Sequence, residues 1–269
     1  MMKPVPVPDG YLTVVTYILA AVVGLCVGSF LNVVIYRVPN KMSLAKPASH
    51  CPQCGYKLKF YDNIPIISYC ILGGRCRSCK KHIPFRYTAV EAGNMLLWIA
   101  CVWRFSGNLI YMIAAMLACS VMVCMAFVDL EHKIIPDRFQ IALLVPAIAA
   151  IFTDTHTVWY DHLIGGGAAF AVFLLLALIA EKILGREALG GGDIKLVGVL
   201  GLMLGWQKLL IMMIIASVTG SIVMLILKKR SEESESPETP FAPFLTAGAL
   251  IALLFGDAIV DLYLGLLLG

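Results

Sequence analysis

Long apolar runs separated by short polar stretches fill most of the chain. A transmembrane helix needs about 20 apolar residues, and most of the runs approach or exceed that length. The run Leu196–Leu204 is too short to cross a bilayer alone, so we expect it to be extended at its ends or to be re-entrant. The eight predicted spans are Tyr11–Tyr36, Thr88–Trp103, Leu109–Val128, Phe139–Phe152, Leu163–Ile179, Leu196–Leu204, Leu209–Leu227 and Phe244–Leu264. The predicted fold class is an all-α polytopic membrane protein.

Composition supports a membrane protein and excludes a single soluble core. Of the 269 residues, 60% are hydrophobic and only 14% are charged. A soluble domain of this length carries about 25% charged residues. The lipid bilayer is therefore a predicted partner of the chain.

The basic residues are concentrated in one loop. Residues 37–86 contain ten of the 21 Lys and Arg residues and a single acid, Asp62. Because basic loops stay on the cytoplasmic side, this loop is predicted to be cytoplasmic. The predicted topology leaves three basic residues outside: Lys3, Arg104 and Lys208. A nucleic-acid site is the competing interpretation, but sidedness already explains the bias, so no nucleic-acid partner is expected.

Two Cys-x-x-Cys turns lie in this cytoplasmic loop. Cys51 and Cys54 form the first, Cys76 and Cys79 the second, and 21 residues separate them. Disulfides are disfavoured in the cytoplasm, whereas four thiolates at this spacing are typical of structural Zn²⁺. The alternative is a set of reduced thiols without metal. We therefore predict three domains: a first transmembrane helix (1–36), a zinc-binding domain (37–87) and a helical transmembrane domain (88–269).

Two aspartates end apolar runs on the same predicted side of the membrane. Asp129 follows Leu109–Val128, and Asp193 lies in a glycine-rich stretch with Gly190 and Gly192. Carboxylates at a membrane edge are costly and often functional. A facing pair can share a proton and activate water, and the glycines permit close backbone approach. The alternative is that both aspartates are solvated and idle.

A third acid, Glu91, lies just inside the second predicted span. A carboxylate in that position should face a polar cavity or a cation. Its neighbour Arg86 is one candidate partner.

Several motifs in order give the chain a family resemblance. They are Gly28–Pro39, Ser49–Cys54, Asp62–Tyr69, the second cysteine pair, Arg86–Glu91, Asp129–Asp137 and Gly190–Lys195. With them the chain resembles the bacterial type IV prepilin peptidases, bifunctional leader peptidases and N-methyltransferases with a Gly-x-Gly-Asp motif. The resemblance covers nearly the whole chain.

The resemblance implies an aspartic endopeptidase of the bacterial inner membrane with its active site on the cytoplasmic side. Its substrates would be type IV prepilins and pseudopilins, cut after a glycine and then N-methylated with S-adenosylmethionine. Asp129 and Asp193 would be catalytic, and Asp137 would have a structural or tuning role. The four cysteines would bind zinc. The residues expected to support the site are Gly190, Gly192, Lys195, Asp137 and Glu91.

Two positions depart from the family pattern. The family usually reads Pro-Phe-Gly-Pro-Phe where this chain has Pro240–Phe244, with Ala242 at the glycine, and Thr88 stands where a proline often follows Arg-Tyr. Neither departure is expected to touch the aspartates.

Three other functions compete with this one. A peptidase without methyltransferase activity would be favoured if the cysteines were missing. A proton-coupled transporter using Asp129 and Asp193 predicts inverted repeats, and the sequence shows none. A zinc-ribbon membrane adaptor leaves the aspartate pair unexplained.

Overall fold

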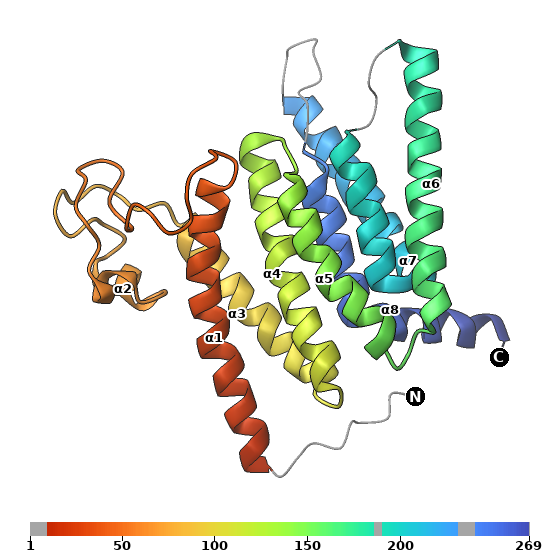
Figure 1. The fold of residues 1–269 in the computed structure, drawn as a ribbon, viewed down its shortest axis with the longest axis horizontal. Helices are drawn as coiled ribbons and strands as arrows, with labels where there is room; N and C mark the ends of the chain where they lie inside the picture. The colour runs from red at the N-terminus through yellow and green to blue at the C-terminus, as the bar shows by residue number, and fades with distance from the viewer. Residues whose placement is uncertain (1–9, 186–189, 231–239, 269) are drawn as a thin grey trace. The chain divides into compact units, whose positions relative to one another are not determined.

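The computed structural model describes residues 10–185, 190–230 and 240–268, and this part of the chain is helical without a β-strand (Figure 1). Two isolated β-bridges occur in the loop after the first helix. The elements are α1 (Gly10–Arg37), the 3₁₀ turn η1 (Phe60–Asn63), α2 (Ile67–Ile71), α3 (Arg86–Phe105), α4 (Leu109–His132), α5 (Asp137–Thr153), α6 (Trp159–Leu184), α7 (Gly191–Arg230) and α8 (Ala242–Leu268). The all-α prediction is confirmed.

Five helical segments of the described chain are long and apolar enough to cross a membrane. They are Gly10–Arg37, Leu109–His132, Trp159–Ile183, Trp206–Lys229 and Ala242–Leu266. The chain is therefore a multi-pass membrane protein. The other three predicted spans correspond to α3, α5 and the first part of α7, and the count of eight stays a prediction.

The described chain divides into two compact units after Gly107. The N-terminal unit (residues 10–107) holds α1 to α3, and the C-terminal unit (residues 108–268) holds α4 to α8. The predicted domain boundaries at residues 36 and 87 stay predictions.

In the N-terminal unit, α1 packs closely against α3. A Cβ atom added to Gly28 would lie 2.8 Å from Glu91 Cα, so only glycine permits this separation. Polar side chains join the helices: Asn94 Nδ2 donates to the Gly24 carbonyl at 2.8 Å, and Asn32 Nδ2 donates to the Tyr87 carbonyl at 3.0 Å. Helices in lipid associate through close packing at small residues and through interhelical hydrogen bonds.

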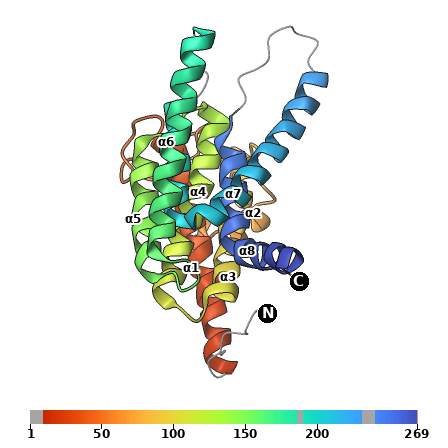
Figure 2. The ribbon, with the colours of Figure 1, turned by 90° about the vertical axis from the view of Figure 1, so that its right-hand side faces the viewer.

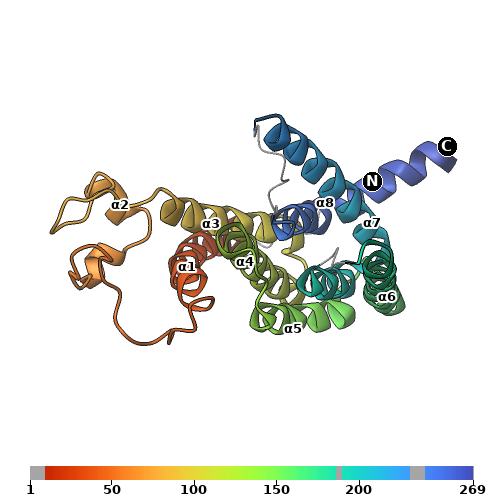
Figure 3. The ribbon, with the colours of Figure 1, turned by 90° about the horizontal axis from the view of Figure 1, so that it is seen from above.

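In the C-terminal unit, four helices form a closed ring. Helix α4 packs on α5, α5 on α7, α7 on α8, and α8 on α4, with α6 outside against α7 (Figure 3). Each helix of the ring thus packs against two of the others.

Helix α7 is interrupted at Gly205, which has φ 77° and ψ 163° (Figure 2). A Cβ there would lie 2.7 Å from Thr157 Cγ2. The position therefore requires glycine for two reasons: a side chain would clash with Thr157, and residues with side chains rarely adopt this positive φ. The first part of α7 begins at Gly191, not at the predicted Leu196, because Gly190 caps it: the Asp193 N–H donates to the Gly190 carbonyl at 3.0 Å. The predicted spans Leu196–Leu204 and Leu209–Leu227 correspond to the two helical segments on either side of Gly205.

A buried ionic cluster surrounds this interruption. Lys208 Nζ lies 2.8 Å from Asp257 Oδ1 and 3.4 Å from Asp154 Oδ2. His162 Nδ1 donates to the Leu202 carbonyl at 2.9 Å, and its Nε2 lies 3.8 Å from Asp154 Oδ2. Burial opposes the charge of Asp154, but the Lys208 ammonium and the His156 N–H outweigh it and hold the pKa of Asp154 below its ordinary value. The cluster ties the two parts of α7 to the turn between α5 and α6.

Candidate active site and metal centre

Asp129 lies in the last turn of α4, close to the beginning of α8. Lys133 ends α4 in a left-handed conformation, with its N–H donating to the Asp129 carbonyl at 2.9 Å. The Asp129 side chain is buried, and its Oδ2 accepts a hydrogen bond from the Ala242 N–H at 2.9 Å. Because Ala242 begins α8, this helix end directs a free backbone donor at the carboxylate.

Asp193 is the third residue of α7 and lies within electrostatic reach of Asp129. Its Oδ1 is buried and has no hydrogen-bond partner among the described residues. A buried polar atom without a partner is costly, and such atoms are concentrated where a water or a ligand belongs. The structure thus brings together the two aspartates that the sequence paired.

The glycines before Asp193 allow its neighbours to approach. A Cβ on Gly192 would lie 3.1 Å from Ile135 Cβ, in the turn between α4 and α5. A Cβ on Gly190 would lie 3.3 Å from Asp193 Oδ2. The Gly192 carbonyl accepts a hydrogen bond at 3.0 Å from Nε2 of Gln140, a buried side chain of α5. Each of the four ring helices therefore supplies one group: Asp129, Gln140, Asp193 and Ala242.

Asp137 and Lys195 form an ion pair beside the aspartates. Lys195 Nζ donates to Asp137 Oδ1 at 2.8 Å, and both side chains are more than half exposed. An exposed pair of this kind contributes little to stability, about 0–1 kcal/mol. The pair links the beginnings of α5 and α7.

Two residues that support the aspartates, Ala242 and Gln140, were not among the predicted site residues. The expectation that the Ala242 segment does not touch the aspartates is wrong, because the Ala242 N–H contacts Asp129 directly. A backbone donor leaves no signature in the side-chain pattern. Gln140 could have been predicted, since an amide side chain within an apolar run indicates an interhelical hydrogen bond.

Glu91 lies in the other unit, on α3. Its Oε2 accepts a hydrogen bond from the Ile66 N–H at 2.8 Å, and the Ser29 hydroxyl also donates to it. Glu91 is thus a partner of α1 and of the loop before α2, and no described contact joins it to Asp129 or Asp193.

The four cysteines converge on one point in the N-terminal unit. Their Sγ atoms all lie within 4.8 Å of one another. Cys51 Sγ and Cys79 Sγ are 3.9 Å apart, as Cys54 Sγ and Cys76 Sγ are 4.0 Å apart. A tetrahedral Zn²⁺ with Zn–S bonds of about 2.3 Å separates its sulfurs by ~3.8 Å. The donor set and its spacing therefore fit a metal ion, and zinc is the ion that four thiolates favour.

The two cysteine turns are local copies of each other, offset by 25 positions (51 to 76). The Gly55 N–H donates to the Cys51 carbonyl at 2.9 Å, and the Lys80 N–H donates to the Cys76 carbonyl at 3.0 Å. Gly55 and Lys80 both have positive φ, 69° and 57°. A β-bridge closes each copy, His50 with Lys57 and Arg75 with His82. This pairing of turns directs two thiols from each side at the same point.

Asp62 connects the second cysteine turn to the loop before α2. Arg77 Nε donates to Asp62 Oδ1 at 2.7 Å, and the Lys59 N–H donates to Oδ2 at 3.2 Å. Burial acts against the charge of this carboxyl, but these donors prevail and hold the pKa of Asp62 below its ordinary value. The single acid of the basic loop is thus a structural partner of an arginine.

The fold and these residues define a class of protein. It is a polytopic helical membrane protein with paired aspartates at one end of a helix ring and a four-cysteine cluster in a loop domain. Two protein-family models match it: the Bacterial Peptidase A24 N-terminal domain over residues 22–105, and the Type IV leader peptidase family over residues 116–225. The chain belongs to the type IV leader peptidase family and is a peptidase.

Curated relatives agree along most of the chain. A "Prepilin leader peptidase/N-methyltransferase" of Myxococcus xanthus is 38% identical, covering 88% of this chain and 72% of the relative. Proteins of the same name from Pseudomonas putida and Pseudomonas aeruginosa are 32% and 34% identical, each alignment covering 90% of this chain and 91% of the relative. No solved structure matches the chain.

Proposed function

We propose that this protein is an aspartic endopeptidase that removes the short basic leader of type IV prepilins and pseudopilins after a glycine. It then N-methylates the new terminal residue with S-adenosylmethionine. The observation that carries the peptidase half is the juxtaposition of Asp129 and Asp193 inside the segment that matches the type IV leader peptidase family. The name shared by the relatives supports the methyltransferase half.

In the proposed cleavage, one aspartate is ionised and removes a proton from water while the other is protonated and donates to the scissile carbonyl. The hydrogen bond from the Ala242 N–H stabilises the ionised form of Asp129 and so favours it as the base. The unpartnered Asp193 Oδ1 is then available to hydrogen-bond the substrate carbonyl or the water. Water attacks the carbonyl carbon, and the C–N bond breaks as the leaving amine takes up a proton.

Gly190 supports the proposed site by leaving the space next to Asp193 Oδ2 free of a side chain, and Gly192 supports it by letting Ile135 pack closely against the beginning of α7. A substrate peptide must leave the helical conformation to expose its scissile carbonyl, and open backbone next to the acid lets an extended peptide approach. Asp137 and Lys195 hold the beginnings of α5 and α7 together around this space.

Zinc has a structural role in this proposal. Cys51, Cys54, Cys76 and Cys79 would fill all four positions of a tetrahedral ion, which leaves none for water. The bound ion would supply folding free energy to the loop domain. Bound S-adenosylmethionine would supply the methyl group for the new amino terminus.

The proposed location is the bacterial inner membrane, crossed eight times, with the aspartates and the cysteine domain on the cytoplasmic side. The concentration of basic residues in 37–86 supports this sidedness. By the same rule a basic leader is expected on the cytoplasmic side, where a cytoplasmic site would meet it.

The test is to replace each aspartate with asparagine, which keeps the size of the side chain but cannot exchange the proton. Asp129→Asn and Asp193→Asn should each lower prepilin cleavage by at least roughly 10²–10⁴-fold. The double variant should be little worse than either single one, because the two groups act together. Cleavage is measured by mass spectrometry on a purified prepilin, together with methylation of a pre-cut pilin.

Asp261→Asn is the matched control, because this carboxylate of α8 is exposed and belongs to neither the aspartate pair nor its supporting residues, so the variant should keep the activity. Methylation of the pre-cut pilin should persist in both single variants. Near wild-type cleavage by either one would reject the pair and make Asp137 the next candidate.

A further inference from the structure

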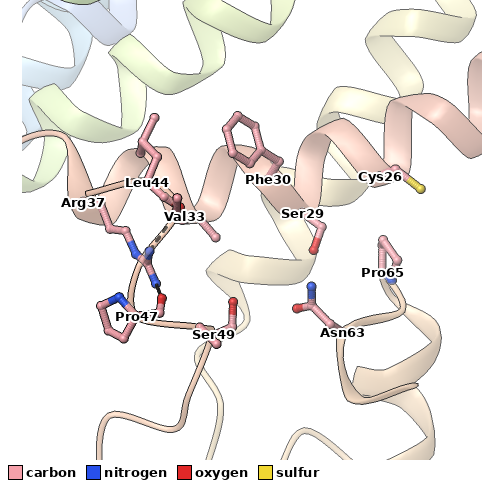
Figure 4. Close-up of a pocket in the computed structure, with 12 residues that line it drawn as sticks. Cys26, Ser29, Phe30, Val33, Arg37, Leu44, Pro47, Ser49, Asn63 and Pro65 are labelled. Carbon is pink, nitrogen blue, oxygen red and sulfur yellow. Dashed lines mark hydrogen bonds between the residues drawn. The ribbon is translucent and has the colours of Figure 1, made fainter. Parts of the chain in front are cut away.

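A cavity of about 370 Å³ lies in the N-terminal unit, remote in sequence from both aspartates (Figure 4). One face of α1 forms its floor, with Cys26, Ser29, Phe30 and Val33. Loop residues 44–49 and 63–65 form its walls. Its volume is in the range of sites for small organic molecules, about 300–1,000 Å³.

The lining of this cavity combines neutral polar groups with apolar ones. Figure 4 shows the polar ends of Ser29, Ser49 and Asn63 directed toward one another between α1 and the loop, with Phe30 and Val33 along the helix. Phe30 borders the cavity, and its ring offers a face on which a planar group can stack. Hydroxyl and amide groups can pair with the edge of a heterocyclic base and with ribose hydroxyls.

Arg37 fixes the wall of the cavity and is occupied in doing so. Its buried guanidinium donates to the carbonyls of Ser43, Leu44 and Pro47 at 2.9, 3.1 and 2.6 Å. These hydrogen bonds hold the loop against α1, so the cavity is formed without a ligand. They also direct the positive charge away from a potential anion, which disfavours a phosphate-containing ligand.

A buried carboxylate lies directly behind Ser29. The Ser29 hydroxyl donates to Glu91, so its oxygen is left as an acceptor toward the cavity. Glu91 is 9% exposed and also accepts a hydrogen bond from the Ile66 N–H at 2.8 Å. Its carboxyl oxygens are acceptors and give this side of the cavity an electronegative character, which suits a cationic ligand.

The loop that reaches Glu91 is strained. Ile66 has φ 60° and ψ −50°, and the Ile67 N–H donates to the Pro65 carbonyl at 2.6 Å, which together make a γ-turn of the rare form with positive φ. A β-branched residue in this conformation is an outlier that its surroundings must impose, and such residues are concentrated at ligand sites. Pro65, at the start of the turn, lines the cavity.

We propose that this cavity binds the adenosyl sulfonium S-adenosylmethionine, with Asn63, Ser49 and Phe30 holding the adenosyl group and the Ser29–Glu91 pair facing the cationic end. This inference rests on the methyltransferase half of the proposed function. The two aspartates lie in the segment matched by the leader peptidase family model, whereas the cavity lies within residues 22–105, matched by the other model. A neutral polar lining, an aromatic ring and a buried carboxylate suit an adenosyl cation.

Cys26 offers a direct readout, because it lines the cavity and its thiol is exposed. The detergent-solubilised full-length protein is treated with N-ethylmaleimide, with and without saturating S-adenosylhomocysteine, and the modified cysteines are quantified by mass spectrometry. The ligand should slow modification of Cys26 at least about fivefold. Cys70 is exposed in the same unit, does not line the cavity and should react unchanged, which makes it the internal control.

Binding of radiolabelled S-adenosylmethionine gives the second readout. Asn63→Ala, Phe30→Leu and Glu91→Gln should each raise its Kd about tenfold or more. Asn40→Ala and Phe60→Leu make the same changes at exposed positions of the unit outside the cavity and should bind like wild type. Asp129→Asn should also bind normally, because the aspartates lie outside this site. Circular dichroism and cysteine-bound zinc content check that each variant is folded.

The outcomes separate this inference from the proposed function. If the wild type neither binds S-adenosylmethionine nor methylates a pre-cut pilin, the methyltransferase half is wrong and the assignment of the cavity falls with it. If the wild type methylates, yet Cys26 is unprotected and folded cavity variants bind normally, the function stands and the assignment of the cavity is wrong. Protection of Cys26 by added phospholipid but not by S-adenosylhomocysteine would also overturn it.

Discussion

Asp129 and the segment carrying Asp193 are held by hydrogen bonds from helices other than their own. The Ala242 N–H of α8 reaches Asp129, and the Gln140 amide of α5 reaches the carbonyl of Gly192. Catalytic groups must be held within about 0.5 Å of their working positions, and supporting hydrogen bonds provide that precision. At the scale of single residues, the neighbours therefore matter almost as much as the carboxylates.

Gln140→Leu tests this support. Leucine fills a similar volume but removes the side-chain donor to the half-buried Gly192 carbonyl, so the beginning of α7 should shift. Prepilin cleavage should fall roughly ten- to a hundredfold, mainly in kcat, because misplacement of a reacting group costs rate more than binding. The same change at Gln207, which is only half-buried and lies beside the interruption of α7, is the control and should have little effect. Wild-type kcat in Gln140→Leu would show that the hydrogen bond has no positioning role.

The two cysteine turns offer a second test on single residues. Lys80 holds the left-handed conformation that Gly55 holds in the other turn. Left-handed backbone costs a side-chain-bearing residue about 1–2 kcal/mol, partly offset by the greater flexibility of glycine in the unfolded chain. Lys80→Gly should therefore slow metal release to a chelator about fivefold, measured with a colorimetric zinc indicator. Gly55→Lys should accelerate it, and faster release in Lys80→Gly would mean that the lysine side chain stabilises its turn.

The chemistry-bearing residues could be predicted from the sequence because their types and spacing are distinctive. Asp129 and Asp193 were identified as carboxylates at the ends of apolar runs, and the four cysteines by their two Cys-x-x-Cys turns; the structure brings each set together. The contact of Ala242 with Asp129 could not be predicted, because a backbone N–H has no residue type. Nor could the match between Lys80 and Gly55, since only the backbone angles reveal it.

Among the elements, α7 is the one whose beginning the sequence described least well. The apolar pattern separated it into two spans, and the structure has two helical segments that meet at Gly205, but the first begins at Gly191, five residues before the predicted Leu196. Periodicity records which residues are apolar but not whether a glycine between two runs forms a loop or a bend. The buried cluster of Asp154, His162, Lys208 and Asp257 surrounds that bend, and its members come from α6, α7, α8 and the turn after α5.

Asp154→Asn tests the role of the cluster. The pKa of Asp154 is lowered in the folded protein, so its charge stabilises the fold above the ordinary aspartate pKa of about 3.9 and loses that effect as the pH falls through the lowered value. At pH 7 the variant should lose about 1–3 kcal/mol of stability, read as a lower Tm in detergent.

The difference in Tm between Asp154→Asn and wild type should narrow as the pH falls below about 4. Asp261→Asn removes an exposed carboxylate of α8 and should leave Tm unchanged at every pH. If the Tm difference between wild type and Asp154→Asn stayed the same at every pH, the loss of stability would come from packing and not from the charge of Asp154.

At the scale of the whole molecule, the two compact units coincide with the two family models. Residues 22–105 match one model and residues 116–225 the other, and the unit boundary falls between them at Gly107. One unit carries the aspartates, and the other carries the cysteine cluster and the proposed methyl-donor cavity. This division is consistent with two activities that can be lost separately.

The proposed topology can be tested with single introduced cysteines. Asn40 lies in the basic loop, whereas Thr155 lies in the turn between α5 and α6, and both are exposed. A membrane-impermeant maleimide should modify Thr155→Cys in intact cells and spare Asn40→Cys until the membrane is opened. Peptide mass mapping separates these sites from the native cysteines. The reverse pattern would place the aspartates on the outer face and overturn the proposed sidedness.

The short first part of α7 has a consequence for the surrounding lipid. From Gly191 to Leu204 it has about 14 residues and rises about 21 Å, while a bilayer core is about 30 Å thick. Such a hydrophobic mismatch is relieved by local thinning of the membrane. Water and headgroups would then come closer to Asp193 than in an undisturbed bilayer. The interruption at Gly205 would thus let a hydrolytic reaction take place at the edge of a nonaqueous medium, and acyl-chain length becomes a determinant of its rate.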